Sequence, residues 1–117
     1  MKHFGTLPDG RATKLYTLTN KHGMTTGISD FGATLVSLTA PDRNGDFADI
    51  TLGFDSVEGY AGGDNPYFGA TVGRHGNRIA RGCFRLDGKD YQLATNNDPG
   101  GIPCHLHGGE VGFNKRL

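Results

Sequence analysis

Apolar residues in this chain alternate with polar ones or form short runs, and the runs are rich in β-branched and aromatic types. A period of two is typical of β-strands, because successive side chains point to opposite faces of a sheet. The most apolar run is Ala33–Ala40, which is too apolar for a fully solvated edge strand. The pattern predicts strands over residues 14–19, 24–29, 33–40, 48–52, 83–86 and 91–94.

Turn-forming residues separate these segments. In Pro41–Gly45, proline fixes φ, while asparagine and glycine accept a positive φ. Asp87-Gly88 lies between two alternating apolar runs, which indicates a hairpin with a type I′ turn. In that hairpin two apolar pairs would share one face, namely Phe84 and Leu86 with Tyr91 and Leu93.

Composition supports an all-β prediction. The length of 117 residues fits one domain, and 20 of the residues are glycine. This many glycines suit tight turns between short strands better than long helices, because glycine in a helix costs backbone entropy. Only Val57–Tyr60 predicts a helical turn, and no segment predicts a long helix.

The charge balance and the cysteine content limit which partners and which cellular location we expect. Twelve basic residues balance twelve acidic ones, so no basic field exists to attract nucleic acid or an anionic membrane. No apolar run approaches the roughly 20 residues that cross a bilayer. A neutral partner such as a sugar suits this balance. Cys83 and Cys104 make no disulfide framework, and no secretory segment follows Met1, so we expect reduced thiols and a cytoplasmic location.

Gly73–Ile79 is the first candidate for chemistry. It places Arg74, Asn77 and Arg78 in one glycine-flanked stretch. Arginine offers a rigid fork of donors, and asparagine offers both a donor and an acceptor, so together they can hold several hydroxyls of a sugar. The alternative is that an arginine simply pairs with a surface carboxylate.

Leu106–Gly109 is the second candidate. His107 can donate or accept a proton near neutral pH, and the glycines after it allow backbone and ligand to approach closely. The alternative is a histidine satisfied by a backbone carbonyl in a turn.

Other local signatures are weak or missing. Histidine and cysteine are zinc ligands, but the spacing of His75, Cys104, His105 and His107 matches no zinc motif, so we expect no metal. The chain has no phosphate-binding G-x-x-x-x-G-K-[ST] loop and no G-x-S-x-G nucleophile elbow.

Several short motifs follow one another along nearly the whole chain. They are F-G-A-T-L-V-S at 31–37, the turn at 41–45, D-I-T-L-G-F-D at 49–55, F-G-A-T-V-G-R at 68–74, N-R-I at 77–79, L-D-G at 86–88, L-H-G-G at 106–109 and G-F-N-K at 112–115. In this order they resemble the N-terminal part of the aldose 1-epimerase (galactose mutarotase) family. The pair G-R-x-x-N-R-I and L-H-G-G is more specific than either motif alone.

The resemblance implies an antiparallel β-sandwich, a galactose-mutarotase-like supersandwich, of which residues 1–117 form the N-terminal portion of one domain. It implies an enzyme that interconverts the α and β anomers of an aldose such as galactose or glucose without a cofactor. Asn77 and Arg78 would hold sugar hydroxyls. His107 would bond the sugar near the reacting end, as a supporting group or possible acid. The family's main acid, a histidine, and its base, a glutamate, follow L-H-G-G at a distance and are not in this chain. We therefore expect the chain alone to be inactive. We also expect it to be poorly stable, because strands taken from a larger sandwich have unpaired edges and an uncovered apolar face.

Alternatives stay open at this point. One is a non-catalytic carbohydrate-binding module, and another is a structural fragment in which no sugar site assembles. Within the same fold, a hexose 6-phosphate epimerase would need extra cations, for which Arg74 and Arg81 are candidates. The chain also departs from the family at 96–104, which is a few residues longer than usual, and at Asn114, where aspartate is common.

Overall fold

The computed structural model describes all residues 1–117, which form two compact units. The first unit comprises residues 1–71 together with residue 117, and the second comprises residues 72–116. Every strand pair in both units is antiparallel, and the only α-helix has five residues. The all-β prediction is confirmed. No helix is long and apolar enough to cross a membrane.

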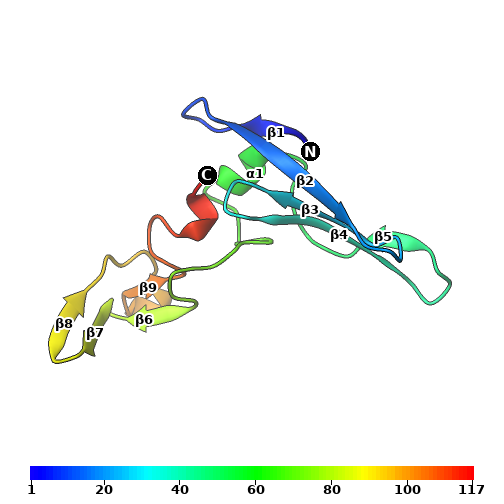
Figure 1. Cartoon of the computed structure of the whole chain (residues 1–117). Helices are drawn as coiled ribbons and strands as arrows, with labels where there is room; N and C mark the ends of the chain where they lie inside the picture. The colour runs from blue at the N-terminus through cyan, green and yellow to red at the C-terminus, as the bar shows by residue number, and fades with distance from the viewer. The chain divides into compact units, whose positions relative to one another are not determined.

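The first unit is built on a five-stranded sheet in which each strand pairs with its neighbour in sequence. Figure 1 shows this meander, from blue to green along the chain. The strands are β1 (Lys2–Thr6), β2 (Ala12–Thr19), β3 (Thr25–Ser29), β4 (Leu35–Pro41) and β5 (Phe47–Asp49). Short hairpin connections make this order the simplest one, since antiparallel strands need only a tight turn between them.

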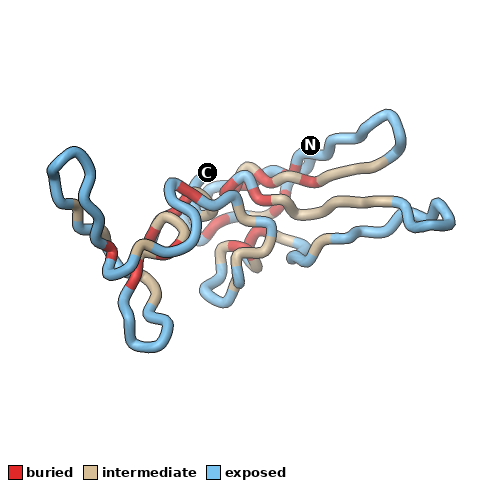
Figure 2. The backbone as a smooth tube through the Cα atoms, turned by 90° about the horizontal axis from the view of Figure 1, so that it is seen from below, coloured by how far each residue is buried: buried red, intermediate tan, exposed pale blue.

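One face of this sheet carries the core. Helix α1 (Val57–Ala61) contacts β1, and its Val57 is fully buried. The ring of Tyr60 lies 6.0 Å from that of Phe4 and meets Phe54 edge-on at 5.2 Å between centroids. Leu7, Leu15 and Phe31 complete the buried cluster. Residues 41–50, at the other end of the sheet, are all exposed, as the pale blue tube in Figure 2 shows.

The predicted strand at 91–94 lies at 89–92 in the structure. In the first unit, a turn and a side-chain hydrogen bond move two other strand ends from the predicted positions. Ala33 has a φ of 46°, which belongs to a turn, so β4 begins at Leu35. The predicted strand at 48–52 ends at Asp49, whose carboxylate accepts the N–H groups of Leu38 and Thr51. That carboxylate replaces a ladder partner, and the chain leaves the sheet.

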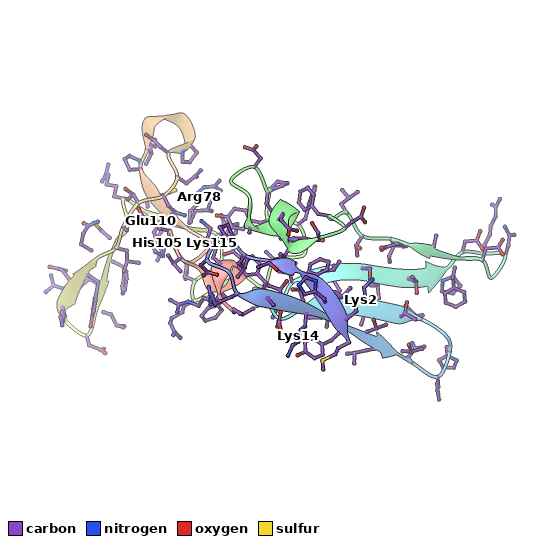
Figure 3. All side chains as sticks on the ribbon, turned by 90° about the horizontal axis from the view of Figure 1, so that it is seen from above. Lys2, Lys14, Arg78, His105, Glu110 and Lys115 are labelled. Atoms are coloured by element: carbon purple, nitrogen blue, oxygen red, sulfur yellow. The ribbon has the colours of Figure 1, made fainter.

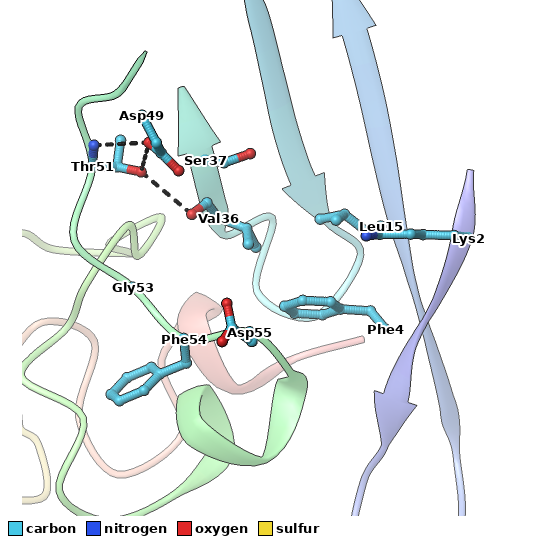
Figure 4. Close-up of a pocket in the computed structure, with 10 residues that line it drawn as sticks. All are labelled: Lys2, Phe4, Leu15, Val36, Ser37, Asp49, Thr51, Gly53, Phe54 and Asp55. Atoms are coloured by element: carbon cyan, nitrogen blue, oxygen red, sulfur yellow. Dashed lines mark hydrogen bonds between the residues drawn. The ribbon is translucent and has the colours of Figure 1, made fainter. Parts of the chain in front are cut away.

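A hollow of about 370 Å³ opens beside this core. Figure 4 shows its polar side, where Thr51 donates to Asp49 and to the carbonyl of Val36. Lys2, Phe4, Phe54 and Asp55 lie on other parts of its wall. None of the predicted site residues lines this hollow, and the Asp49 carboxylate already accepts hydrogen bonds from the chain itself.

The second unit contains two short antiparallel strand pairs. Strand β7 (Cys83–Leu86) pairs with β8 (Lys89–Gln92), and β6 (Arg78–Ala80) pairs with β9 (Cys104–Leu106). Asp87 and Gly88 both have positive φ, at 49° and 75°, as the predicted type I′ turn requires. Phe84 and Tyr91 stack at 4.9 Å, which confirms that this pair shares a face. Single-turn 3₁₀ segments at Pro99–Gly101 and Phe113–Lys115 complete the unit.

Candidate functional site

The pairing of β6 with β9 brings the three predicted site residues together, although 29 positions separate Arg78 from His107 in the sequence. Arg78 is the Cα partner of Leu106 in this ladder. Asn77 and His107 are therefore the next residues beyond the paired end, one on each strand. The main-chain N–H of His107 donates to the carbonyl of Asn77 at 3.0 Å and continues the ladder.

Asn77 and His107 are also joined through the imidazole. The N–H of Asn77 donates to Nδ1 of His107 at 3.0 Å. Both residues have left-handed backbone, with φ of 58° and 50°. Among residues other than glycine, asparagine and histidine are enriched in this conformation, which explains why such residue types occur at both positions. The imidazole plane is thus anchored to the backbone beside Arg78.

The glycines after His107 are required by the chain itself. Gly108 has a φ of 94°, and a Cβ there would collide with the carbonyl oxygen of Gly73. A Cβ on Gly109 would contact the ring of His105 at 2.5 Å. These close approaches are to protein atoms, and they fold the L-H-G-G loop back against the segment that begins with Gly73.

Arg78 is held by two amide oxygens. Its Nε–H donates to Oδ1 of Asn97 at 3.0 Å, and Nη1 donates to Oδ1 of Asn77 at 3.2 Å. The chain contains two ion pairs, Arg11–Asp9 and Arg85–Asp90, so no carboxylate pairs with Arg78. The surface ion-pair alternative is therefore wrong for this arginine. It is also wrong for Arg74, whose guanidinium lies 5.3 Å from the centre of the Phe113 ring.

The alternative considered for His107 was a hydrogen bond from the ring to a backbone carbonyl. The structure shows that contact for His105 instead. Its Nδ1 lies 2.8 Å from the carbonyl oxygen of Ala94, whereas Nδ1 of His107 accepts a backbone N–H. Arg78 and His105, both labelled in Figure 3, come from the paired strands β6 and β9. His105 is the Cα partner of Ile79, so these two side chains share the face opposite to Arg78.

That opposite face lines a hollow of about 520 Å³. Its wall is largely apolar, with Ile79, Phe84 and Leu93 beside Arg74, His75 and His105. The predicted site residues do not line this hollow. Asn77 and Arg78 are exposed and His107 is half-buried, so their polar groups form an open surface cluster. No group of three histidine, cysteine or acidic side chains in the chain is arranged to hold a metal ion.

The chemistry of the cluster is that of hydrogen-bond donors. Arginine has five N–H donors, of which Arg78 uses one at Nε and one at Nη1. The Asn77 oxygen accepts from Arg78, which leaves its amide NH₂ group as a donor. A neutral imidazole that accepts at Nδ1 carries its proton at Nε2. Such a set suits the oxygen atoms of a polyol and includes no group placed to act as a base.

Comparison with known proteins decides the family. The aldose 1-epimerase family model matches residues 14–116, and galactose mutarotase of Bos taurus is 46% identical over 97% of this chain. The chain belongs to the aldose 1-epimerase family. Human galactose mutarotase is 43% identical over the same share of this chain. The chain spans about a third, 32%, of the length of both relatives.

Solved structures agree on the fold. A GalM/aldose epimerase homologue from C. elegans superposes with a TM-score of 0.78 at 41% identity, covering 90% of this chain and 31% of that protein. Galactose 1-epimerase from Lactobacillus acidophilus gives a TM-score of 0.71 at 27% identity, covering 97% of this chain and 31% of that protein. The fold expected from the aldose 1-epimerase resemblance is confirmed.

Two residues near the cluster carry no signal in the sequence. Asn96 accepts the N–H of Leu106 at 2.7 Å and donates to the carbonyl of the same residue at 3.0 Å, which fixes β9 immediately before His107. Asn97 holds Arg78. Both lie in a polar loop that precedes the L-H-G-G motif, where asparagine is unremarkable.

Proposed function

We propose that this chain supplies the sugar-holding residues of an aldose 1-epimerase that interconverts the α and β anomers of hexoses such as galactose and glucose. The proposal depends on one observation, the junction at which Asn77 bonds both His107 and Arg78. It unites the N-R-I and L-H-G-G motifs in one cluster of donors. The guanidinium has no carboxylate partner there and keeps its charge available for sugar oxygens.

The reaction explains why a donor cluster is useful. Mutarotation opens a cyclic hemiacetal when a base removes the proton of the C1 hydroxyl while an acid protonates the ring oxygen. The aldehyde then rotates and closes on its other face. Both groups must act on one small ring, so fixing the ring in place contributes much of the catalysis. We propose that Asn77 and Arg78 hold hydroxyls and that His107 donates to an oxygen near the reacting end.

We also propose that the main acid and base are not among these 117 residues and that the chain alone binds sugar without accelerating mutarotation. The donor cluster supports this, because it holds no group placed to act as a base. That residues 1–117 form the N-terminal portion of a single domain, and that the protein is cytoplasmic, stay predictions.

A titration of the ¹⁵N-labelled chain with D-galactose, followed by NMR, tests the binding proposal. We expect shifts at Asn77, Arg78 and His107. Arg78→Lys keeps the charge but loses the planar fork, so it should weaken binding about tenfold. The matched control is Arg11→Lys, which alters an ion-paired arginine in the first unit and should leave the affinity unchanged. An equal effect of both substitutions would reject the site.

Polarimetry separates binding from catalysis. Freshly dissolved α-glucose should lose its excess rotation at the buffer rate in the presence of the chain. Acceleration by the purified chain would contradict the proposed division between holding and catalytic residues. A hexose 6-phosphate that binds far more tightly than its free sugar would instead favour the phosphate-sugar alternative.

A further inference from the structure

Asn97 is tied to Arg78 and to the strand that leads to His107. Its Oδ1 accepts the Nε–H of Arg78 at 3.0 Å. Its main chain pairs with Cys104 in both directions, with nitrogen-to-oxygen distances of 3.3 Å and 2.8 Å. The thiol of Cys104, which is 2% exposed, lies 3.5 Å from the same Oδ1. The amide oxygen of Asn97 is therefore fixed by main-chain pairing on a buried residue.

Two acceptors on different edges determine how the guanidinium is oriented. Asn97 takes Nε–H, and Asn77 takes a hydrogen of Nη1. The guanidinium is planar, so two anchors at separate nitrogen atoms set both its position and its plane. Neither anchor uses Nη2.

The neutrality of both anchors matters as much as their positions. A carboxylate beside arginine commonly takes two parallel N–H groups and neutralises the charge. An amide oxygen accepts only one N–H group and does not neutralise the positive charge of the guanidinium. Arg78 thus keeps its charge and its Nη2 donors in a fixed orientation.

We propose that Asn97 is a positioning residue that holds the Arg78 guanidinium for ligand oxygens, a role that rests on the sugar-binding function proposed above. Asn97 does this from the polar loop that precedes β9. The role requires an uncharged acceptor at position 97.

Two substitutions separate positioning from folding. Asn97→Ala removes the acceptor, so the Nε–H of Arg78 should exchange with water about tenfold faster, and galactose should bind about fivefold more weakly. Asn97→Asp keeps an acceptor and adds an ion pair, so the Nε–H should stay protected. Galactose binding should nevertheless weaken at least as much, because the second carboxylate oxygen competes for Arg78 donors.

The arginine Nε–H resonances in ¹⁵N spectra report the positioning directly, with Arg78→Lys used to assign the signal. Asn114→Asp is the matched control, since it adds the same charge in the same unit at a position outside the cluster, and it should change neither measurement. Wild-type Nε–H exchange in Asn97→Ala, or wild-type galactose affinity in both Asn97 variants, would overturn the positioning role. If the wild-type chain shows a protected Nε–H but binds no galactose, the sugar-binding function itself fails, and this role fails with it.

Discussion

His105 and His107 bond the main chain in opposite senses, although they are only two residues apart. Nδ1 of His105 faces the carbonyl oxygen of Ala94, which can only accept, so that nitrogen carries the proton. Nδ1 of His107 receives the N–H of Asn77, so it carries none. The neutral forms of the two imidazoles are therefore different tautomers. Of these two histidines, only His107 carries its proton on Nε2.

The tautomers are directly measurable. At about pH 8, where an ordinary histidine is neutral, long-range ¹H–¹⁵N spectra should show protonation at Nδ1 for His105 and at Nε2 for His107. The spectra distinguish the two nitrogens by their shifts and couplings. An Nδ1–H signal for His107 would contradict the bond to Asn77 and remove the basis for its role as a donor.

His107→Asn separates the two functions of the imidazole. Asparagine tolerates left-handed backbone, and its Oδ1 can replace Nδ1 as the acceptor for Asn77. The variant should keep the fold but lose the Nε2–H donor, which weakens galactose binding about fivefold. Titration by NMR measures the affinity, and the Asn77 amide shift reports the retained bond. His107→Ala should lose both the Nε2–H donor and the acceptor for the Asn77 N–H. Equal Asn77 amide shifts in the two variants would therefore contradict this separation of the two functions.

The sequence predicts the strands that form by local alternation and misses those that form by long-range pairing. Residues 83–86 alternate clearly and end at an Asp-Gly turn, so their hairpin was predictable. Strands β6 and β9 have three residues each and place Arg78 and His105 where alternation would favour an apolar residue. They exist because they pair across 20 or more positions, which no local pattern encodes.

The same distinction applies to the candidate site. Asn77, Arg78 and His107 stand out because they lie in motifs, and the β6–β9 register then places them together. Asn97 lies in no motif, and its bond to Arg78 depends on the main-chain pairing with Cys104. The sequence around Asn97 and the sequence around Arg78 give no sign of the contact between them. Side chains that support a site from a loop become visible only once the tertiary pairing is known.

Asp49 should make the stability of the first unit depend on pH in the acidic range. Hydrogen bonds from the N–H and hydroxyl of Thr51 and from the N–H of Leu38 hold its pKa below the usual 3.8. A pKa that is lower in the folded state contributes stability above the unfolded pKa, and that contribution is lost as pH falls through the folded pKa.

Urea unfolding between about pH 7 and about pH 2 measures this dependence. The unfolding midpoint of the first unit should fall on acidification, and Asp49→Asn should reduce the fall. Asp9, Asp42 and Glu58 also have lowered pKa values, so part of the dependence should remain. Asp46→Asn is the control, because the Asp46 carboxylate makes no hydrogen bond or ion pair, and the pH profile of this variant should match that of the wild type. A steeper fall in Asp49→Asn would show that the sign is wrong.

Gly108→Ala should disrupt the loop that carries His107. The left-handed φ of 94° disfavours any side chain, and the added Cβ would also collide with the carbonyl oxygen of Gly73, which accepts the N–H of Phe113. Strain and overpacking together should cost about 3 kcal/mol.

Gly100→Ala is the matched control, since its φ of 67° is also left-handed but nothing lies within 4 Å of the added Cβ. It should cost about 1 kcal/mol, from backbone strain alone. Urea unfolding followed by amide signals of residues 72–116 measures both, and equal losses would show that the contact with Gly73 contributes nothing.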